Sequence, residues 1–391
     1  MKSEWKISTI GAACSLVTDG SHSSPKSVES GEYMVSVKDF TEYGFDFTSC
    51  RRISSDDYET LKRNGCVPEQ GDILIGKDGA RYFEDIIIYR QPERPALLSS
   101  IAILRCNKEE IQPEFLYYTL RTPGFKQDVR DNYGSGSAIP RIILKDFKRM
   151  PISYPSLEVQ KQITAVLSIL DQRIQANTKI NDNLAELLQT VYQDRFGDVS
   201  AATEQGMLSD ICSYSRDRVA VSELNTSTYF STENMLPGKA GSTDASSLPT
   251  IPQTTACHKG DTLISNIRPY FKKIVYCEGR CGCSTDVLCF TPVQPKYAAY
   301  LFSTLYADKF FAFMVAGSKG TKMPRGDKQQ IMAYPVALPS DEELDEFNAL
   351  ALPILAQLHS NKVENKRLSA TRDALLPKLM SGEIEVSGIQ L

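Results

Sequence analysis

The second half of this chain repeats the first, and that duplication limits what it can fold into more than any other feature. Pro140-Arg141 recurs as Pro324-Arg325, 184 residues later. Without a gap, the same offset relates Gly136 to Gly320, Pro151 to Pro335, Asn177 to Asn361 and Val191 to Leu375. A repeat of this length is a duplicated domain rather than a solenoid of short units. We therefore expect two similar domains that engage two similar targets at once.

Length and composition predict a soluble, intracellular protein. The 391 residues suffice for two domains of ordinary size, and 41% hydrophobic with 24% charged residues is typical of globular chains. No apolar run reaches the length of a membrane span, and the start Met1-Lys-Ser-Glu-Trp-Lys6 lacks the apolar core of a signal peptide. We expect a cytoplasmic location, no membrane contact, and ten cysteines that are mostly free thiols.

The net charge of −4 argues at first against a nucleic-acid partner, but the acidity is unevenly distributed. Residues 340–391 carry five basic and nine acidic side chains, whereas residues 197–339 carry fourteen basic and twelve acidic ones. A local basic face therefore remains compatible with either large segment.

The pattern along the chain alternates between globular and helical segments. Short apolar runs broken by Gly, Pro and Ser predict strands in residues 1–155 and 197–339, with a short helix that begins at Pro113. Seven-residue spacing predicts long helices over residues 156–196 and 340–382, and residues 383–391 form a tail. The predicted fold class is α+β: two similar mixed α/β domains separated by two long antiparallel helices that form a coiled coil, with a pseudo-two-fold repeat.

Each predicted helix carries an apolar stripe with a central asparagine. The stripe positions are Ile163, Leu170, Asn177, Leu184 and Val191 in the first helix, and Phe347, Ile354, Asn361, Leu368 and Leu375 in the second. Val166, Ile180 and Leu187 fill the intervening positions of the first stripe, and Pro353 is expected to kink the second helix. A buried Asn fixes register and partner choice. We favour pairing of the two helices; the alternative is that each helix packs on its own domain.

Signatures of stand-alone catalysis are missing from the sequence. It contains no GxxxxGK[ST] phosphate loop, no Asn/Asp-Pro-Pro-aromatic run of an adenine methyltransferase, and only three histidines. The cysteines at 277, 281, 283 and 289 have a spacing unlike that of paired zinc knuckles. We therefore predict no catalytic residue, no metal site and no cofactor bound by this chain.

Glycine-rich loops that end in Pro-Arg are the first candidate binding elements. Small residues let the backbone approach a phosphate, and hydroxyl and N–H groups are good phosphate donors. The loop at 134–141 offers Ser135, Ser137 and Arg141, and the loop at 317–325 offers Lys319, Lys322 and Arg325. The alternative is a flexible connection ahead of each helix.

Cations interleaved with aromatic residues form the second candidate element. The segment at 266–273 contributes Asn266, Arg268, Tyr270, Lys272 and Lys273, and its counterpart in the first half contributes Lys77, Arg81 and Tyr82. Ser21 and His22 lie in a polar loop early in the first domain. This mixture suits phosphate neutralisation and base stacking, so the residues of both candidate elements are predicted nucleic-acid contacts, and the resemblance described next implies that the nucleic acid is DNA.

Taken together, the motifs resemble a known family. They are Asp19-Gly-Ser-His22-x-x-Pro25, Gly71-Asp72-Ile-Leu, the loop at 134–141, and Pro155-Ser-Leu-Glu158-Val-Gln160-Lys-Gln-Ile163 at the first helix. The chain resembles the DNA specificity subunit of type I restriction–modification systems over nearly its whole length. Val159 separates the Glu-Gln pair of the family pattern, and the second copy at Pro339 lacks that pair.

The resemblance implies a division of labour. Each domain would be a target recognition domain that reads half of a split double-stranded DNA site, and the helices would set the spacer. The helices would also dock two methyltransferase subunits that bring S-adenosylmethionine, and an endonuclease/translocase subunit with ATP and Mg would join them. Two other readings remain open: a coiled-coil adaptor between proteins, and an independent nuclease or methyltransferase.

Overall fold

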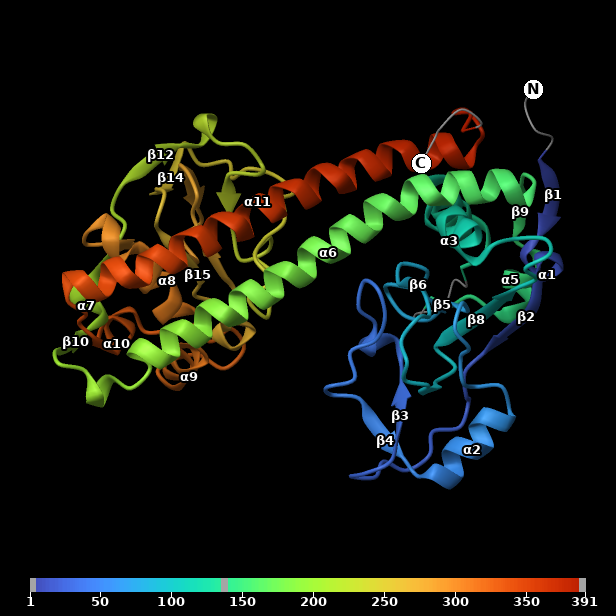
Figure 1. Cartoon of the computed structure of the whole chain (residues 1–391), viewed down its shortest axis with the longest axis horizontal. Coiled ribbons are helices and arrows are strands. Elements are labelled where there is room, and N and C mark those ends of the chain that lie inside the picture. Colours follow the sequence, from blue (N-terminus) through green and yellow to red (C-terminus); the bar gives the residue numbers. More distant parts are fainter. Residues whose placement is uncertain (1–4, 135–139, 387–391) are drawn as a thin grey trace. The chain divides into compact units, whose positions relative to one another are not determined.

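The computed structural model describes residues 5–134 and 140–386 and divides into two compact units (Figure 1). Unit 1 comprises residues 1–174 and 366–391, and unit 2 comprises residues 175–365. Unit 1 therefore combines the first and the last described segments of the chain. No helix in the described part of the chain combines the length and apolar character needed to cross a membrane.

Unit 1 is built on a four-stranded antiparallel sheet in the order β2-β8-β5-β6. Its strands are β2 (Cys14–Asp19), β8 (Ile101–Cys106), β5 (Ile73–Gly76) and β6 (Ile86–Ile88). A second sheet holds β4 (Arg51–Ile53), β3 (Glu32–Val35) and β7 (Ala96–Leu97), and β1 (Lys6–Thr9) pairs with β9 (Pro151–Tyr154). The helices are α1 (Ile10–Ala13), α2 (Ser55–Arg63), α3 (Pro113–Arg121), α4 (Pro123–Asn132), α5 (Leu144–Arg149) and the first part of α6 (Leu157–Phe196).

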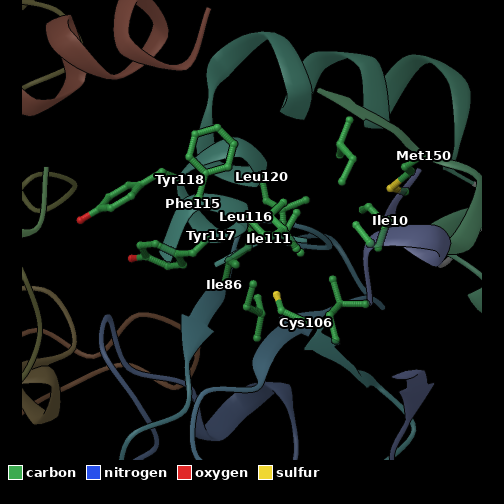
Figure 2. Packing of buried hydrophobic residues seen from close by; sticks show 14 of the residues in the cluster. Ile10, Ile86, Cys106, Ile111, Phe115, Leu116, Tyr117, Tyr118, Leu120 and Met150 are labelled. Carbon is green, nitrogen blue, oxygen red and sulfur yellow. The ribbon is translucent and has the colours of Figure 1, made fainter. Parts of the chain in front are cut away.

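The core of unit 1 lies between the four-stranded sheet β2-β8-β5-β6 and α3 (Figure 2). All four residues of β5 are buried, which explains its continuous apolar sequence. Pro113 occupies the first turn of α3, where its missing N–H costs nothing, and Phe115, Leu116 and Leu120 point into the core. Burial of each such side chain contributes about 1.5–3 kcal/mol. The predicted helix at Pro113 is confirmed.

Unit 2 repeats this plan. Its main sheet has the order β11-β18-β15-β16, formed by β11 (Cys212–Tyr214), β18 (Val287–Pro292), β15 (Thr262–Ser265) and β16 (Ile274–Tyr276). A second sheet contains β12 (Arg218–Ala220), β14 (Gln253–Cys257), β17 (Cys281–Cys283) and β13 (Tyr229–Phe230), and β10 (Gln205–Met207) pairs with β19 (Pro335–Ala337). The helices are α7 (Leu208–Ile211), α8 (Ala298–Tyr306), α9 (Asp308–Ala316), α10 (Lys328–Met332), the remainder of α6 and most of α11 (Asp341–Met380).

The duplication predicted from the sequence is confirmed element by element. The order β2-β8-β5-β6 matches β11-β18-β15-β16, and the pair β1-β9 matches β10-β19. Helices α6 and α11 are each 40 residues long, and α11 begins 184 residues after α6. The fold class is thus α+β, with two similar mixed domains and two long helices.

A repeated Gly-Asp turn shows why one sequence motif recurs. Gly71 and Gly260 have φ angles of 93° and 92°, which only glycine adopts without strain. The carboxylate of the following Asp72 accepts a hydrogen bond from the N–H of Glu69, and Asp261 does the same for His258, both at 2.8 Å. The motif therefore builds the turn before β5 and β15.

Helices α6 and α11 pair antiparallel within each unit. In unit 1, Asp171 of α6 contacts Arg372 of α11. In unit 2, Asn177 contacts Glu364, and Arg195 near the end of α6 contacts Glu346 near the start of α11. The partner number falls as the α6 number rises, which defines the antiparallel direction. Both helices also contribute buried residues to the core of each unit, so helix pairing and domain packing occur together.

The structure corrects part of the expected stripe on α6. Ile180 and Leu187 are 44% and 49% exposed, and Val166 is only partly buried. Leu167, Ile174 and Leu188, each one residue later in its heptad, are buried instead. The predicted stripe combined each heptad position such as Ile163 with the residue three positions later, Val166. The contact face of this helix instead uses the residue four positions later, Leu167.

The ten predicted pairing positions differ in burial. Ile163, Asn177, Phe347 and Asn361 are buried, whereas Leu170, Leu184, Val191, Ile354, Leu368 and Leu375 are partly buried. Helix α11 continues through Pro353 and Pro377 without interruption and reaches Met380, because Leu376, Leu379 and Met380 are buried in the unit 1 core.

Candidate nucleic-acid interface

In unit 2, the structure brings the two predicted binding loops together. Ile267 and Arg325 form an isolated β-bridge, and the N–H of Arg268 donates to the carbonyl of Pro324 at 2.8 Å. The guanidinium of Arg268 donates to the carbonyl of Lys322 at 3.3 Å. Segments 266–273 and 317–325 are therefore one surface, although more than forty residues separate them in the sequence.

Unit 1 contains the same arrangement. Asp78 and Arg141 form a β-bridge, and the N–H of Gly79 donates to the carbonyl of Pro140 at 3.0 Å. This hydrogen bond is the counterpart of the one from Arg268 to Pro324. The Pro-Arg motif recurs because each copy joins two loops of its unit. One loop follows β5 or β15, and the other precedes the short helix α5 or α10. The structure thus has one paired-loop site in each unit.

The loop cations of unit 2 mostly have carboxylate partners. Arg325 contacts Asp286 at 3.1 Å, and Lys319 contacts Asp327 at 2.6 Å. Lys272 shares Asp308 with Lys239, both at 2.8 Å. Hydrogen bonds from these two lysines hold the pKa of Asp308 below its usual value. The carboxylates fix the cations in place, and a phosphate that approached them would compete for the same donors.

Lys273 points toward the protein rather than toward solvent. Its ammonium donates to the carbonyl of Thr232 at 2.6 Å, and partial burial lowers its pKa. Lys322, in contrast, is exposed. Asn266 is buried, so its side chain lies beneath the surface that Arg268 and Lys322 form.

An aromatic turn projects from this surface. The 3-10 turn η4 (Pro269–Phe271) is flanked by Arg268 and Lys272, whose φ angles of 50° and 51° are left-handed. Tyr270 and Phe271 are 50% and 39% exposed. Backbone donors of Gly238 and Lys239 bond the carbonyls of Phe271 and Lys272 at 2.8 and 2.9 Å. Strained backbone that is braced in this way is typical of binding sites.

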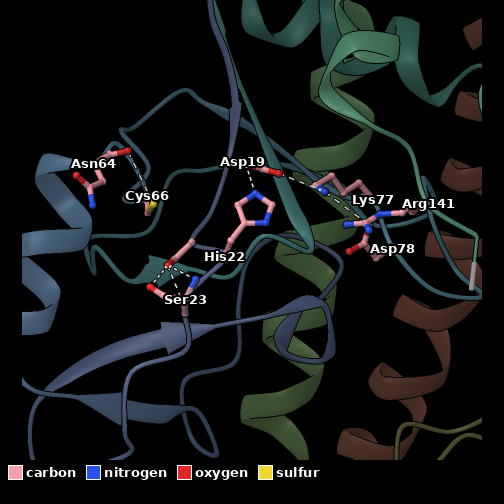
Figure 3. A network of polar contacts seen from close by, with 9 residues as sticks. Asp19, His22, Ser23, Asn64, Cys66, Lys77, Asp78 and Arg141 are labelled. Atoms are coloured by element: carbon pink, nitrogen blue, oxygen red, sulfur yellow. Dashed lines mark hydrogen bonds and ion pairs between the residues drawn. The ribbon is translucent and has the colours of Figure 1, made fainter.

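The unit 1 network corrects the role predicted for Lys77 (Figure 3). Its side chain is only 2% exposed, and its ammonium lies 3.2 Å from Asp19 and 3.7 Å from Asp78. His22 contacts the other oxygen of Asp19 at 3.4 Å. Lys77 therefore neutralises the buried Asp19 and the partly buried Asp78 and does not present its charge to a phosphate, whereas His22 and Arg141 are exposed.

The remaining predicted residues of unit 1 fall into different environments. Arg81 is exposed and bonds Asp85 at 2.8 Å. Tyr82 is partly buried and packs against the core. Ser21 is buried and bonds Ser23. Ser135 and Ser137 lie outside the described residues.

A polar hollow in unit 2 was not predicted from the sequence. It has a volume of about 300 Å³, and its lining includes Thr232, Ser246, Ser284 and Asp286. Asp286 also holds Arg325, so the hollow adjoins the paired loops. Hydroxyl and carboxylate groups of this kind can hydrogen-bond base edges. Its residues come from three segments, at 229–234, 245–249 and 284–286, and no local pattern marked them.

The cysteine cluster of unit 2 is apolar in character. Five thiols, those of Cys257, Cys277, Cys281, Cys283 and Cys289, share one buried cluster with Met235, Leu263 and Val287. Across residues 5–134 and 140–386, no group of three or more His, Cys, Asp or Glu side chains is arranged to hold a metal ion. These cysteines pack as small hydrophobic residues.

Comparison with known proteins identifies relatives of this architecture. The family model of the type I restriction modification DNA specificity domain matches residues 2–186. The type I restriction enzyme MjaIX specificity subunit of Methanocaldococcus jannaschii is 22% identical over 306 residues, which cover 71% of each chain. The HindI specificity subunit of Haemophilus influenzae is 25% identical over 137 residues, which cover 33% of this chain and 28% of that one.

A solved structure shares the fold. The type I restriction–modification S subunit from M. genitalium matches with a TM-score of 0.55 and 17% identity, and the match covers 96% of both chains. The likeness extends over both units and both long helices.

Proposed function

Because the chain belongs to the family of DNA specificity subunits of type I restriction–modification systems, we propose that each of its units reads one half of a bipartite double-stranded DNA site. The recurrence of the paired-loop site is the observation that carries this proposal. The hydrogen bond from Gly79 to Pro140 in unit 1 has its counterpart between Arg268 and Pro324 in unit 2. Two similar sites in one chain suit two half-sites in one DNA molecule.

The loop chemistry suits DNA contact. Arg141, Arg268, Lys322 and Arg325 are exposed cations on or beside the paired loops and would bind phosphates, which set position but not sequence. The hydroxyl-lined hollow beside Asp286 would offer donors and acceptors to base edges in unit 2. Two readers joined in one chain gain affinity by effective concentration, provided that both half-sites fit.

The long helices would act as the frame and the docking surface. They would fix the spacer between half-sites and bind two methyltransferase subunits, and an endonuclease/translocase subunit would complete the assembly. Ile169, Ile180 and Leu187 on α6, with Leu350, Leu352 and Val363 on α11, expose apolar side chains that a partner could cover. S-adenosylmethionine, ATP and Mg²⁺ would belong to those partners, and this chain would be a non-catalytic cytoplasmic subunit.

Mapping of methylated adenines in host DNA tests the proposal. In cells with the gene, we expect methylation at a motif of two short elements separated by a spacer of fixed length. Deletion of the gene should abolish methylation at that motif and leave other methylated motifs unchanged. An unchanged methylation map would reject the proposal.

A further inference from the structure

The seam between α6 and α11 contains a buried ion pair in unit 1. The guanidinium Nη1 of Arg372 donates to Oδ1 of Asp171 at 2.8 Å, and both side chains are about nine-tenths buried. Tyr118 donates its hydroxyl to the other oxygen of Asp171 at 2.7 Å. Arg372 also contacts Asp373 at 2.9 Å. The buried charges thus have complete partners.

The duplication places apolar residues at the equivalent positions of unit 2. The offset of 184 between the two helices carries Asp171 onto Leu355 and Leu188 onto Arg372. Leu188 and Leu355 are both buried in one apolar cluster of unit 2. In α8, Ser303 takes the place that Tyr118 has in α3. The seam is therefore charged at one place and apolar at the equivalent place.

The central asparagines, in contrast, obey the repeat. Asn177 donates to Asn365 at 2.9 Å, and Asn361 donates to Asn181 at 2.8 Å. The offset relates Asn177 to Asn361 and Asn181 to Asn365, so these two contacts are copies of each other. The asparagine contacts fix the register of the seam. They would form equally well between α6 and α11, between two copies of α6 or between two copies of α11, so they do not select the partner.

The contacts Asn177–Glu364 and Arg195–Glu346 also lack a counterpart under the offset, but Glu364 is only partly buried and Arg195–Glu346 is exposed, whereas the Asp171–Arg372 pair is a buried charge pair. The buried pair is therefore the contact whose loss is most costly when a helix meets the wrong partner.

If α6 of a second chain occupied the place of α11 in the same register, Asp171 would face Leu188. If two copies of α11 paired, Arg372 would face Leu355. Either arrangement replaces the opposite charge across the helix pair by a leucine, so that Asp171 keeps only its Tyr118 contact or Arg372 only its Asp373 contact, which is strongly unfavourable for a buried charge. The pairing of α6 with α11 is the combination that matches charge with charge and Leu with Leu.

We propose that the Asp171–Arg372 pair selects the partner of each helix, so that α6 accepts α11 and rejects α6 of a second copy of this chain. A duplicated seam would otherwise be self-complementary and would permit dimers through like helices. A polar pair at a single place in a seam specifies partners in this way by penalising the wrong combination. The selection depends on the fold alone and not on DNA binding.

Co-refolding of two tagged versions of the full chain tests the proposal. Chains with different affinity tags are unfolded together in denaturant, refolded by dilution, captured through one tag and probed for the other. Two wild-type chains can still exchange their α11 helices, because Asp171 of each chain then meets Arg372 of the other. This exchange sets the background level of co-capture. In Asp171→Leu/Arg372→Leu, all four seam positions are leucine, and we expect on the order of tenfold more co-capture.

A second variant moves the charge pair to the other unit. Asp171→Leu/Arg372→Leu/Leu188→Arg/Leu355→Asp places the ion pair at 188 and 355, and the proposal predicts that co-capture returns to the wild-type level. Co-capture of the double Leu variant at the wild-type level would overturn the proposal. Should that variant fail to fold, the neutral pair Asp171→Asn/Arg372→Gln replaces it. Failure of both to fold would assign the pair a purely stabilising role and also overturn the proposal.

Discussion

Asn361 on α11 donates its side-chain amide to Oδ1 of Asn181 on α6, 2.8 Å away. The same contact recurs between Asn177 and Asn365, with the roles of the helices exchanged. The two contacts lie next to each other in the seam of unit 2. A polar interruption at this place fixes how far the two helices slide along each other, because any shift separates four buried or partly buried amides from their partners.

The first prediction concerns this asparagine contact. Asn361→Leu removes one partner of Asn181 and of Gln357, and we expect it to lower the free energy of unfolding by about 1–3 kcal/mol. The double variant Asn361→Leu/Asn181→Leu should lose less than the sum of the two single variants, because it removes both partners together. Denaturant unfolding of the four proteins measures the coupling. Additive losses would show that the two amides do not interact.

The second prediction concerns Lys77. Lys77→Ala leaves Asp19 buried without its cation, so we expect a loss of about 3–5 kcal/mol in the stability of unit 1. Lys108→Ala, at an exposed lysine of the same unit, is the control and should change stability by less than about 0.5 kcal/mol. Thermal unfolding measures both. Equal effects of the two substitutions would place Lys77 outside any buried network.

The third prediction concerns phosphate contact in unit 2. Lys322→Ala in the complete methyltransferase complex should reduce the slope of log K against log salt by about 0.9, the value for one phosphate neutralised. Lys273→Ala should leave the slope unchanged, because its ammonium is bound to Thr232. Equilibrium binding to a methylation-site duplex at several salt concentrations gives both slopes. An unchanged slope for Lys322→Ala would remove this residue from the interface.

The fourth prediction is a pH dependence. Burial raises the pKa of Asp261 above its usual 3.8. The equivalent Asp72 of unit 1 bonds Arg105, but in unit 2 the position of Arg105 is occupied by the uncharged Thr291. A raised folded-state pKa means that the folded protein binds this proton more tightly than the unfolded chain. The contribution of Asp261 to the free energy of unfolding is therefore fully present below pH 3.8. It is lost as the pH rises through the raised pKa of the folded state.

Asp261→Asn provides the test of that pH dependence. The amide stays neutral, so the variant should lack the decline that begins above pH 3.8. Unfolding of both proteins by denaturant across that pH range measures the difference. Parallel stability profiles would contradict the assignment.

Much of the fold could be predicted from the sequence because duplication and periodicity are local signals. The offset between Pro140 and Pro324 gave the two domains, and seven-residue spacing gave both helices. The choice of the contact face on α6 failed at Ile180 and Leu187, because both they and the buried Leu188 are apolar and only tertiary contacts select between them.

The candidate site was predictable only in outline. Loop composition marked Arg268, Lys322 and Arg325 as candidate binding cations in two separate loops, and the structure shows that these loops meet and that the three side chains are exposed. It could not show that Lys77 lies beneath the surface, since its burial depends on Asp19, which belongs to another strand. Asp286 and Asp308 were missed for the same reason: their role arises from contacts with distant segments.

One chimera tests most directly whether each unit reads its own half-site. Residues 6–154, from the start of β1 to the end of β9, replace residues 205–337, which span the equivalent elements β10 to β19. Methylated adenines are then mapped in host DNA that carries the chimera in place of the wild-type gene. The account predicts a motif in which the half-site read by unit 1 occurs at both ends in opposite orientation. Methylation that retains the two different half-sites of the wild type would contradict it.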